Sequence, residues 1–261
     1  MGPGSGQAHT QRGARVTSAE RRAALEVIAA EVTACTRCRL HSGRTKAVPG
    51  EGHMDTEVVF VGEAPGMNED RAGRPFVGRA GDLLVRMLDT VSWKRDEVFI
   101  TNVVKCRPPD NRDPEPDEIE ACLPYLQRQL AVIDPPLIVT LGRHSMGRFI
   151  PGAKISQIHG TSHPVDPTTG ASGAMVYAMY HPAAALRSSD VERQSFDDAA
   201  GIPAALLEAR ARRIGPIDVA ESANGRARAT EPLPLPKADH RPTPTTESIT
   251  MDPAPDAPTF F

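Results

Sequence analysis

The chain has 261 residues, of which 39% are hydrophobic and 24% charged, a composition typical of one α/β domain with terminal extensions. No apolar run approaches the roughly 18 residues that a membrane span needs. No signal-peptide pattern is present, so we expect a cytoplasmic protein. The net charge is −3, and the seven acidic and four basic residues of 216–261 leave 26 of each in residues 1–215. This balance excludes a globally basic nucleic-acid binder, so any such site has to be a local patch.

The N-terminal segment has the pattern of an arm followed by a helix. Residues 1–16 carry few apolar side chains, and we expect them to be flexible. Thr17 and Glu20 have the spacing of a capping box, which marks a helix start. The apolar residues that follow share one helical face: Leu25, Ile28, Ala29 and Val32. This helix would bring the CxxC pair at residues 35–38 to its end.

Short apolar segments alternate with helical patterns over the domain predicted at residues 17–215. Strands are predicted at residues 57–61, 98–101, 137–141 and 175–180. Helices are predicted at residues 83–91, 115–133 and 191–213. Pro116 suits the first turn of the second helix, and Pro124 should kink it. The alternation predicts an α/β fold with a mostly parallel four-stranded sheet flanked by helices, in which ligands bind at the carboxyl ends of strands.

The composition changes at residue 216. Nine of the 25 prolines lie in residues 216–261, with few large apolar side chains between them. Such a segment buries too little surface to offset the entropy of ordering, so we predict a disordered tail. An inert extension and a docking segment for a replication or repair protein both remain open, and the tail's partner is unknown.

The four cysteines have the pattern Cys35-x2-Cys38, then Cys106, then Cys122. A pair at a helix end, one cysteine after a strand and one on a helix can converge on one metal centre. Four thiolates fit zinc or an iron–sulfur cluster about equally well. Two alternatives stay open: buried free cysteines, and a redox dithiol at Cys35 and Cys38. Disulfides are not expected in the cytoplasm.

Five polar or glycine-rich segments stand at or near the predicted strand ends. They are residues 62–66 (GEAPG), 74–81 (RPFVGRAG), 101–109 (TNVVKCRPP), 141–143 (LGR) and 181–187 (HPAAALR). In this order, with the cysteines between them, they resemble the family-four uracil-DNA glycosylases of bacteria and archaea. The resemblance covers about residues 20–213. It implies a three-layer sandwich with a structural [4Fe–4S] cluster on the four cysteines. It also implies an enzyme that flips uracil out of DNA and hydrolyses its N-glycosidic bond, which initiates base-excision repair.

The resemblance and side-chain chemistry give a predicted uracil-binding set of Gly62, Phe76, Asn102 and Glu69. Phe76 matches a family residue that stacks on the flipped base, with an ordinary core Phe as the alternative. Asn102 can accept from uracil N3–H and donate to O4, a pattern that cytosine reverses, although a strand-end Asn can also cap a turn. Glu69 matches a family Glu and would exclude thymine, because Gly66 offers no bulk there. A solvated loop Glu is its alternative.

The predicted catalytic residues are Glu63, His181 and Asn111. His181 fits as a hydrogen-bond donor to the charge that develops on uracil O2, although a His-Pro dipeptide also forms turns. The best-known glycosylase family has an Asp where this chain has Ala64, so the residue that orients the water is Glu63 or Asn111. The remaining histidines of this region are expected to be structural or at the surface: His144, His159 and His163.

DNA contacts are predicted on both sides of the pocket. The loop of residues 184–187 should enter the minor groove, with Leu186 or Arg187 filling the gap left by the base. Predicted phosphate contacts are Arg107, Arg112, Arg143, Arg187 and Lys105. Each of these also suits a solvated surface. A related group bonds covalently to DNA through a His in an Arg-rich insertion, and residues 110–113 (DNRD) contain no such His, so we expect ordinary turnover.

Two other functions remain open from the sequence. One is a non-catalytic metal-containing module that binds single-stranded nucleic acid through Phe76 and the arginines. The other is an electron-transfer protein. An electron-transfer protein would not need Asn102 and His181 at neighbouring strand ends, and a binding module would not need residues 62–66 facing them. The expected partner is uracil-containing DNA, single- or double-stranded, bound by a monomer.

Overall fold

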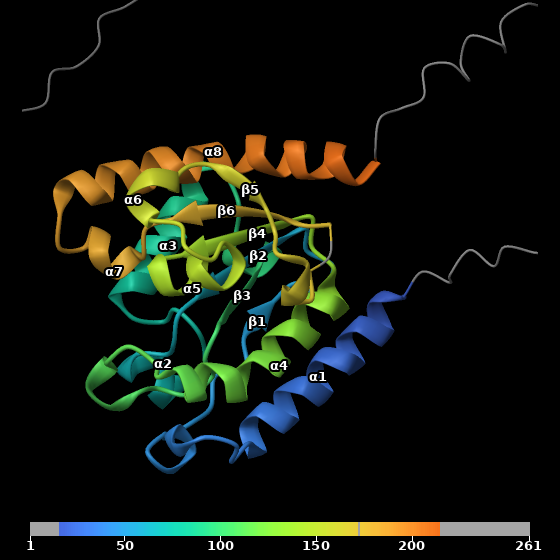
Figure 1. Cartoon of the computed structure of the whole chain (residues 1–261), viewed down its shortest axis with the longest axis vertical. Helices are drawn as coiled ribbons and strands as arrows, with labels where there is room; N and C mark the ends of the chain where they lie inside the picture. Colours follow the sequence, from blue (N-terminus) through green and yellow to red (C-terminus); the bar gives the residue numbers. More distant parts are fainter. Residues whose placement is uncertain (1–15, 172, 215–261) are drawn as a thin grey trace, which may run out of the picture. The chain divides into compact units, whose positions relative to one another are not determined.

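A computed structural model describes residues 16–171 and 173–214 (Figure 1). The predicted tail and, apart from Val16, the predicted arm lie outside these residues. Four parallel strands form the centre of the sheet: β2 (Val58–Gly62), β3 (Phe99–Asn102), β4 (Leu137–Leu141) and β6 (Met175–Met179). They lie in the order β3-β2-β4-β6. The predicted α/β class and its four parallel strands are therefore confirmed, with ends shifted by about one residue, as is usual for such boundaries.

The predicted strand count was wrong, because the sheet has six strands. A short strand pairs antiparallel at each edge: β1 (Glu51–Gly52) beside β3, and β5 (Ser162–Pro164) beside β6. Neither segment has the apolar alternation of a strand. A two-residue Glu-Gly strand and a three-residue strand that ends in proline leave no periodic signal, and both are formed only because a longer neighbour offers free hydrogen-bonding groups.

The sheet separates two buried cores. All five residues of β2 are buried; Val59 and Val61 pack in the core with α1 (Ser18–Ala34) and α4 (Pro116–Ile133). Val58 and Phe60 point into the other core, with α3 (Arg79–Thr90) and α8 (Ser189–Ile214). In Figure 1, α8 covers one face of the sheet while α1 and α4 lie on the other. Alternate side chains of one apolar strand thus face opposite layers, as the continuous apolar runs predict.

The main helices follow their sequence signals. The Thr17 hydroxyl accepts from Glu20 N, and Thr17 N donates to the Glu20 carboxylate, so the predicted capping box starts α1. Helix α4 continues through Pro124 to Ile133. Helix α8 is longer than predicted and runs through Pro203 without a break.

Short helices connect these elements. The remaining α-helices are α2 (Met67–Ala72), α5 (Arg143–Phe149), α6 (Ile155–Ile158) and α7 (Pro182–Ala185). The 3-10 turns are η1 (Arg39–Ser42), η2 (Arg95–Glu97), η3 (Pro109–Asn111) and η4 (Pro167–Thr169). Within the described part of the chain, no helix combines the length and the apolar character needed to span a bilayer.

The strand order creates a crevice at one edge of the sheet. From β2 the chain passes to β3 on one side, and β4 then takes the place on the other side of β2. The connections that leave β2 and β4 therefore diverge at their carboxyl ends. In parallel sheets, this switch in direction opens the crevice where ligands bind.

Candidate functional site

A cleft of about 560 Å³ lies at the carboxyl ends of the four parallel strands. Glu63 follows β2, Asn102 ends β3, Gly142 follows β4 and His181 follows β6, and all four line the cleft. Its volume falls within the roughly 300–1,000 Å³ typical of small-molecule sites. The structure thus brings together residues that are up to 118 positions apart in the chain.

Phe76 is held at the edge of this cleft by close packing. Its side chain is only 6% exposed, and its backbone φ is +50°, in the left-handed region. The ring centroid lies 5.8 Å from that of His181 with the planes 30° apart. A Cβ at Gly62 would lie 2.7 Å from Phe76 Cζ, and one at Gly81 would overlap the Phe76 carbonyl. Phe76 therefore belongs to the core and to the cleft wall at once, and both glycines are needed to let it sit there.

Among the described residues that line the cleft, Asn102 alone has a buried side-chain acceptor that lacks a hydrogen-bond partner. The residue is 1% exposed, and its Oδ1 has no hydrogen bond. Gly62 pairs with Asn102 in the parallel ladder, and a Cβ on Gly62 would overlap this oxygen. Leaving such a group unpaired costs about 1–3 kcal/mol. An unpaired acceptor in a cleft wall is a group that a ligand N–H can satisfy.

Glu69 holds two loops of the cleft together. Its carboxylate accepts hydrogen bonds from Gly66 N (3.1 Å), Val77 N (2.9 Å) and Gly78 N (3.0 Å). The first is the N-cap residue of α2, and the others follow Phe76. Glu69 lines the cleft, as expected, but it lies in the first turn of α2, so the alternative of a solvated loop residue was wrong. Through these hydrogen bonds, Glu69 positions the loop that carries Phe76.

His181 is fixed as a neutral hydrogen-bond donor. It is the N-cap of α7, and its Nδ1 accepts a hydrogen bond from Ala183 N at 3.1 Å. The ring proton is thereby assigned to Nε2. Burial lowers the pKa of His181 to about 4, with Arg187 adding to the shift and Glu69 opposing it. At neutral pH the ring thus carries no charge and keeps one N–H to donate.

A second polar group surrounds Glu63. Ligand atoms of Glu63, Asp113 and His144 all lie within 4.8 Å of one another. Asp113 Oδ2 lies 3.1 Å from His144 Nε2 and 3.1 Å from Arg143 Nη2. Burial raises the pKa of Glu63 above its usual value, and Asp113 adds to the shift while His144 and Arg143 oppose it.

Sequence reasoning missed two members of this group. His144 was predicted to be structural or at the surface, and Asp113 was not singled out, yet both line the cleft. The signal was available for His144, because it lies two residues after Gly142, which follows the buried strand β4. For Asp113 the sequence offers no such signal, because its partner Arg143 lies 30 positions away in the chain.

Of the other two histidines, neither lines the cleft. His159 Nδ1 lies 3.0 Å from an oxygen of Asp198, and its ring centroid is 4.6 Å from that of Tyr180. His163 pairs with Thr161. Both therefore have the structural surroundings expected of them.

Asn111 lies in a turn of unusual backbone conformation. Its φ is +53°, and that of the preceding Asp110 is +55°. The Asn111 side-chain oxygen accepts from Arg107 Nε at 2.8 Å. Both Asn111 and Asp113 line the cleft, so this turn forms part of its wall. Two consecutive non-glycine residues at positive φ indicate strain that the surroundings must hold.

The predicted DNA contacts differ in how accessible they are. Arg143 and Arg187 are exposed and line the cleft. Leu186 is half-buried and packs against the core of α3 and α8. Arg112 makes two hydrogen bonds to the Glu118 carboxylate, at 2.9 and 2.6 Å. Arg187 is thus more accessible than the neighbouring Leu186.

The prediction that Lys105 contacts phosphate was wrong. Its side chain is 1% exposed, and Nζ donates to Thr101 Oγ1, the Asn102 carbonyl and Gln129 Oε1. In the sequence, a lysine that stands near arginines predicts a solvent-exposed position. Its burial is set by residues from β3 and α4 that only the fold brings to it.

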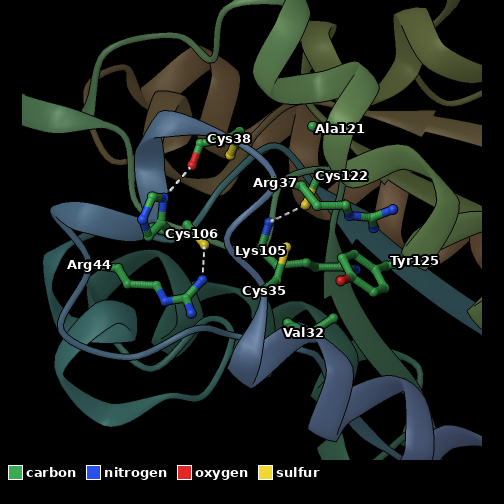
Figure 2. A pocket seen from close by; sticks show the side chains of 11 residues that line it. Val32, Cys35, Arg37, Cys38, Arg44, Lys105, Cys106, Ala121, Cys122 and Tyr125 are labelled. Carbon is green, nitrogen blue, oxygen red and sulfur yellow. Dashed lines mark hydrogen bonds between the residues drawn. The ribbon is translucent and has the colours of Figure 1, made fainter.

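The four cysteines line one narrow cavity on the α4 side of the sheet (Figure 2). Cys35 follows α1, Cys38 precedes η1, Cys106 follows β3 and Cys122 lies in α4, and all four are free thiols. Three chain segments therefore meet at the cavity, as the spacing predicts.

The spacing of the four sulfur atoms bears on the metal. Among the described residues, only Glu63, Asp113 and His144 form a trio of ligand atoms within 4.8 Å of one another. No three of the cysteine sulfurs are that close. Four thiolates on one tetrahedral zinc, at about 2.3 Å each, would lie about 3.8 Å apart. The four thiols are therefore not drawn together as closely as the ligands of one bound zinc.

Hydrogen-bond donors surround these thiols. Arg44 Nη1 donates to Cys106 Sγ at 3.1 Å, and Lys105 N donates to Cys122 Sγ at 3.2 Å (Figure 2). Burial raises the pKa of Cys122 to about 11 and raises that of Cys106. Such thiols stay protonated at neutral pH unless a metal centre compensates their charge.

Comparison with known proteins places this geometry in one family. Residues 49–200 match the uracil DNA glycosylase superfamily. A type-4 uracil-DNA glycosylase of Sulfurisphaera tokodaii is 51% identical over 177 residues, 65% of this chain and 79% of that protein. One of Thermotoga maritima is 44% identical over 67% of this chain and 90% of that protein. A type-5 uracil-DNA glycosylase of Pyrobaculum aerophilum is more distant, at 31% identity over 155 residues.

Proposed function

Because the chain belongs to the type-4 uracil-DNA glycosylases, we propose that it binds a uracil flipped out of DNA in the cleft and hydrolyses its N-glycosidic bond. A base inside a duplex is out of reach of a cleft, so the nucleotide has to leave the stack, at a cost of a few kcal/mol. The product is an abasic site and free uracil, and the enzyme acts as a monofunctional hydrolase in DNA repair.

The unpaired oxygen of Asn102 is the observation that carries this proposal. Uracil offers an N3–H donor to this oxygen and an O4 acceptor to the amide NH₂ of the same side chain. Cytosine has an unprotonated N3 and an amino group in these places, so its binding leaves buried groups unpaired. Hydrogen-bonding sites discriminate strongly for this reason.

Phe76 and His181 act on the two parts of the leaving base. The Phe76 ring forms an apolar wall against which the base stacks. His181 Nε2–H donates to uracil O2, where negative charge develops as the glycosidic bond breaks. A preorganised donor of this kind contributes about 3 kcal/mol. The neutral imidazole can perform this task, because its Nδ1 is taken up by Ala183 N and its one proton, on Nε2, remains to be donated.

Glu63 and its neighbours orient the attacking water. An ionised Glu63 accepts a hydrogen bond from the water and faces the positive charge that develops on the sugar. Asp113 and His144 lie within reach of the same water position. Asn111 shapes this wall through its turn and its bond to Arg107. Glu63 is therefore the water-orienting residue of the proposal, and Asn111 supports it.

The four cysteines would hold a [4Fe–4S] cluster in this proposal. Such a cluster takes four thiolate ligands, and all four cysteines line this one cavity. Its contribution would be structural, because Cys35 at the end of α1, Cys38, Cys106 after β3 and Cys122 in α4 would be joined at one point. Because the segment after β3 also ends the strand that carries Asn102, a stable cluster helps to fix the cleft.

DNA would reach the cleft over the α7 side. Arg187 and Arg143, which line the cleft, would contact phosphate, as would Arg107 beside Asn111, and Leu186 would wedge into the space left by the base. Single- and double-stranded uracil-containing DNA are both proposed substrates. We propose a monomer that works in the cytoplasm, in line with the sequence-based expectation.

Release of free uracil from a uracil-containing oligonucleotide, with no added cofactor, tests the proposal. The wild type should release uracil and leave an alkali-labile site. His181→Ala should reduce the single-turnover rate about 10²-fold. The exposed His53 provides a matched control, since His53→Ala should keep the wild-type rate. DNA binding without any release, even at high enzyme concentration, would favour the non-catalytic binding module instead.

A further inference from the structure

Lys105 is buried, and no acidic side chain of the described residues pairs with its side-chain nitrogen. It lies three residues after Asn102, between β3 and the first metal-binding cysteine of that segment. Its ammonium group donates to Thr101 Oγ1 at 2.6 Å, Gln129 Oε1 at 2.7 Å and the Asn102 carbonyl at 2.8 Å. Three donors thus meet three neutral oxygens. A buried ammonium is costly, so it persists only where its hydrogen bonds are complete.

The oxygens that receive these bonds are themselves fixed. Gln129 Nε2 donates to the Pro49 carbonyl at 2.7 Å, and Thr101 Oγ1 donates to the same carbonyl at 3.0 Å. Pro49 precedes the edge strand β1, and Gln129 lies in α4. The side chain of Lys105 therefore joins β3, α4 and the segment before β1 in one closed network.

The backbone of Lys105 is anchored at the cysteine cavity. Its N–H donates to Cys122 Sγ at 3.2 Å, and its carbonyl accepts from Val48 N at 2.8 Å. Figure 2 shows Lys105 at the wall of this cavity beside Cys122 and Cys106. From there the side chain turns back to the end of β3. One residue thus spans the distance between the cysteine cavity and the backbone of the cleft residue Asn102.

We infer that Lys105 is a positioning residue for uracil recognition: its ammonium group clamps the backbone of Asn102 and so holds the unpaired side-chain oxygen at the point where the base arrives. The inference rests on the proposed function. The Asn102–Val103 peptide is held at both of its polar atoms: Val103 N donates to the Gly62 carbonyl at 2.9 Å, and Lys105 Nζ donates to the Asn102 carbonyl at 2.8 Å, so loss of the Lys105 bond leaves the peptide free to tilt. A small tilt moves a side-chain acceptor out of hydrogen-bond range, and recognition by one amide tolerates little displacement.

A double-mutant cycle separates this role from a merely structural one. Lys105→Met keeps the length and removes the three donors. It should lower the single-turnover excision rate about tenfold or more in the wild-type background, and by less than about twofold in the Asn102→Ala background. An equal loss in both backgrounds overturns the inference, as does an unchanged rate for Lys105→Met alone. Lys94→Met, at an exposed lysine, is the matched control and should leave the rate unchanged in both backgrounds.

Gln129→Leu covers the case in which Lys105→Met does not fold. It removes one of the three acceptors of Lys105 and the bond to Pro49, and leaves the ammonium next to Asn102. It should cause a smaller loss of rate that also disappears in the Asn102→Ala background.

Iron content and thermal stability are measured on every variant. Loss of iron in both variants, in parallel with the rate, assigns Lys105 to the cysteine site and overturns the inference. Uracil release by the wild type reports on the proposed function alone, whereas the ratio between backgrounds reports on Lys105.

Discussion

The base cleft and the cysteine cavity are built from neighbouring segments but in opposite ways. The cleft is open, has an unpaired buried oxygen at Asn102 and places Phe76, Asp110 and Asn111 at positive φ. The cysteine cavity is narrow, joins three chain segments and surrounds its thiols with donors. The base cleft retains a strained backbone and an unpaired polar group that a ligand can satisfy. In the cysteine cavity, hydrogen-bond donors already contact the thiols. Substitutions in the two regions should therefore separate loss of activity from loss of stability.

The largest effect is expected for Cys106→Ala. Removing one of the four proposed ligands should release the proposed cluster, and the three segments would then lose their common anchor. We expect loss of visible absorbance and of bound iron, and a protein that unfolds or is strongly destabilised in thermal melts. Thr33→Ala, on an exposed position of α1, serves as control. A folded, active and iron-containing Cys106→Ala variant would contradict the structural role of the cavity.

Asn102→Ala should produce the opposite pattern. Excision should fall about 10²–10³-fold, as when a key hydrogen-bonding group is removed from an active site. Stability should stay the same or rise, because the buried oxygen that lacks a partner is gone. Chemical denaturation and single-turnover rates, measured on the same samples, test both expectations. Asn68→Ala, at an exposed asparagine of α2, is the control. If the excision rate of Asn102→Ala fell only as far as its loss of folding stability explains, the contrast between the two regions would be contradicted.

The pH dependence of stability sharpens the comparison at His181. Burial lowers its pKa to about 4 from the usual 6.5, so between these values the unfolded chain binds a proton that the folded chain does not. Stability should therefore fall as the pH drops from 6.5 towards 4, by up to about 3 kcal/mol, and the His181 contribution should be constant above 6.5. His181→Gln should show a dependence that is shallower by about one proton. Equal slopes for the two proteins would mean that His181 is not buried in its neutral form.

The smallest effect is expected for Arg187→Ala. An exposed arginine at the edge of the cleft should contribute one phosphate contact and nothing to folding. Its removal should weaken binding to all DNA sequences alike and lower the salt dependence of binding by about one counterion. Fluorescence anisotropy over a salt series measures the slope. Arg212→Ala, at an exposed residue near the end of α8, should keep the wild-type slope, and an unchanged slope for Arg187→Ala would remove that residue from the DNA surface.

Much of this architecture could be predicted because its signals are local. Buried parallel strands such as β2 and β4 are continuous apolar runs, and polar residues at the carboxyl ends of the parallel strands, such as Glu63 after β2 and Asn102 at the end of β3, meet in space because the strands run in the same direction. The edge strands β1 and β5 could not be predicted, since they exist only by pairing with longer neighbours. Lys105 shows the same limit. Its charge predicts exposure, and only the meeting of β3 with α4 supplies the oxygens that make burial possible.

The most direct test of the central claim compares oligonucleotides that differ only in the base at one position: uracil, cytosine or thymine. Mass spectrometry of the bases released in a single turnover measures recognition in the cleft and hydrolysis together. The account predicts free uracil from the first oligonucleotide and no cytosine or thymine from the other two. Equal release of uracil and cytosine, or binding of all three without release, would contradict it.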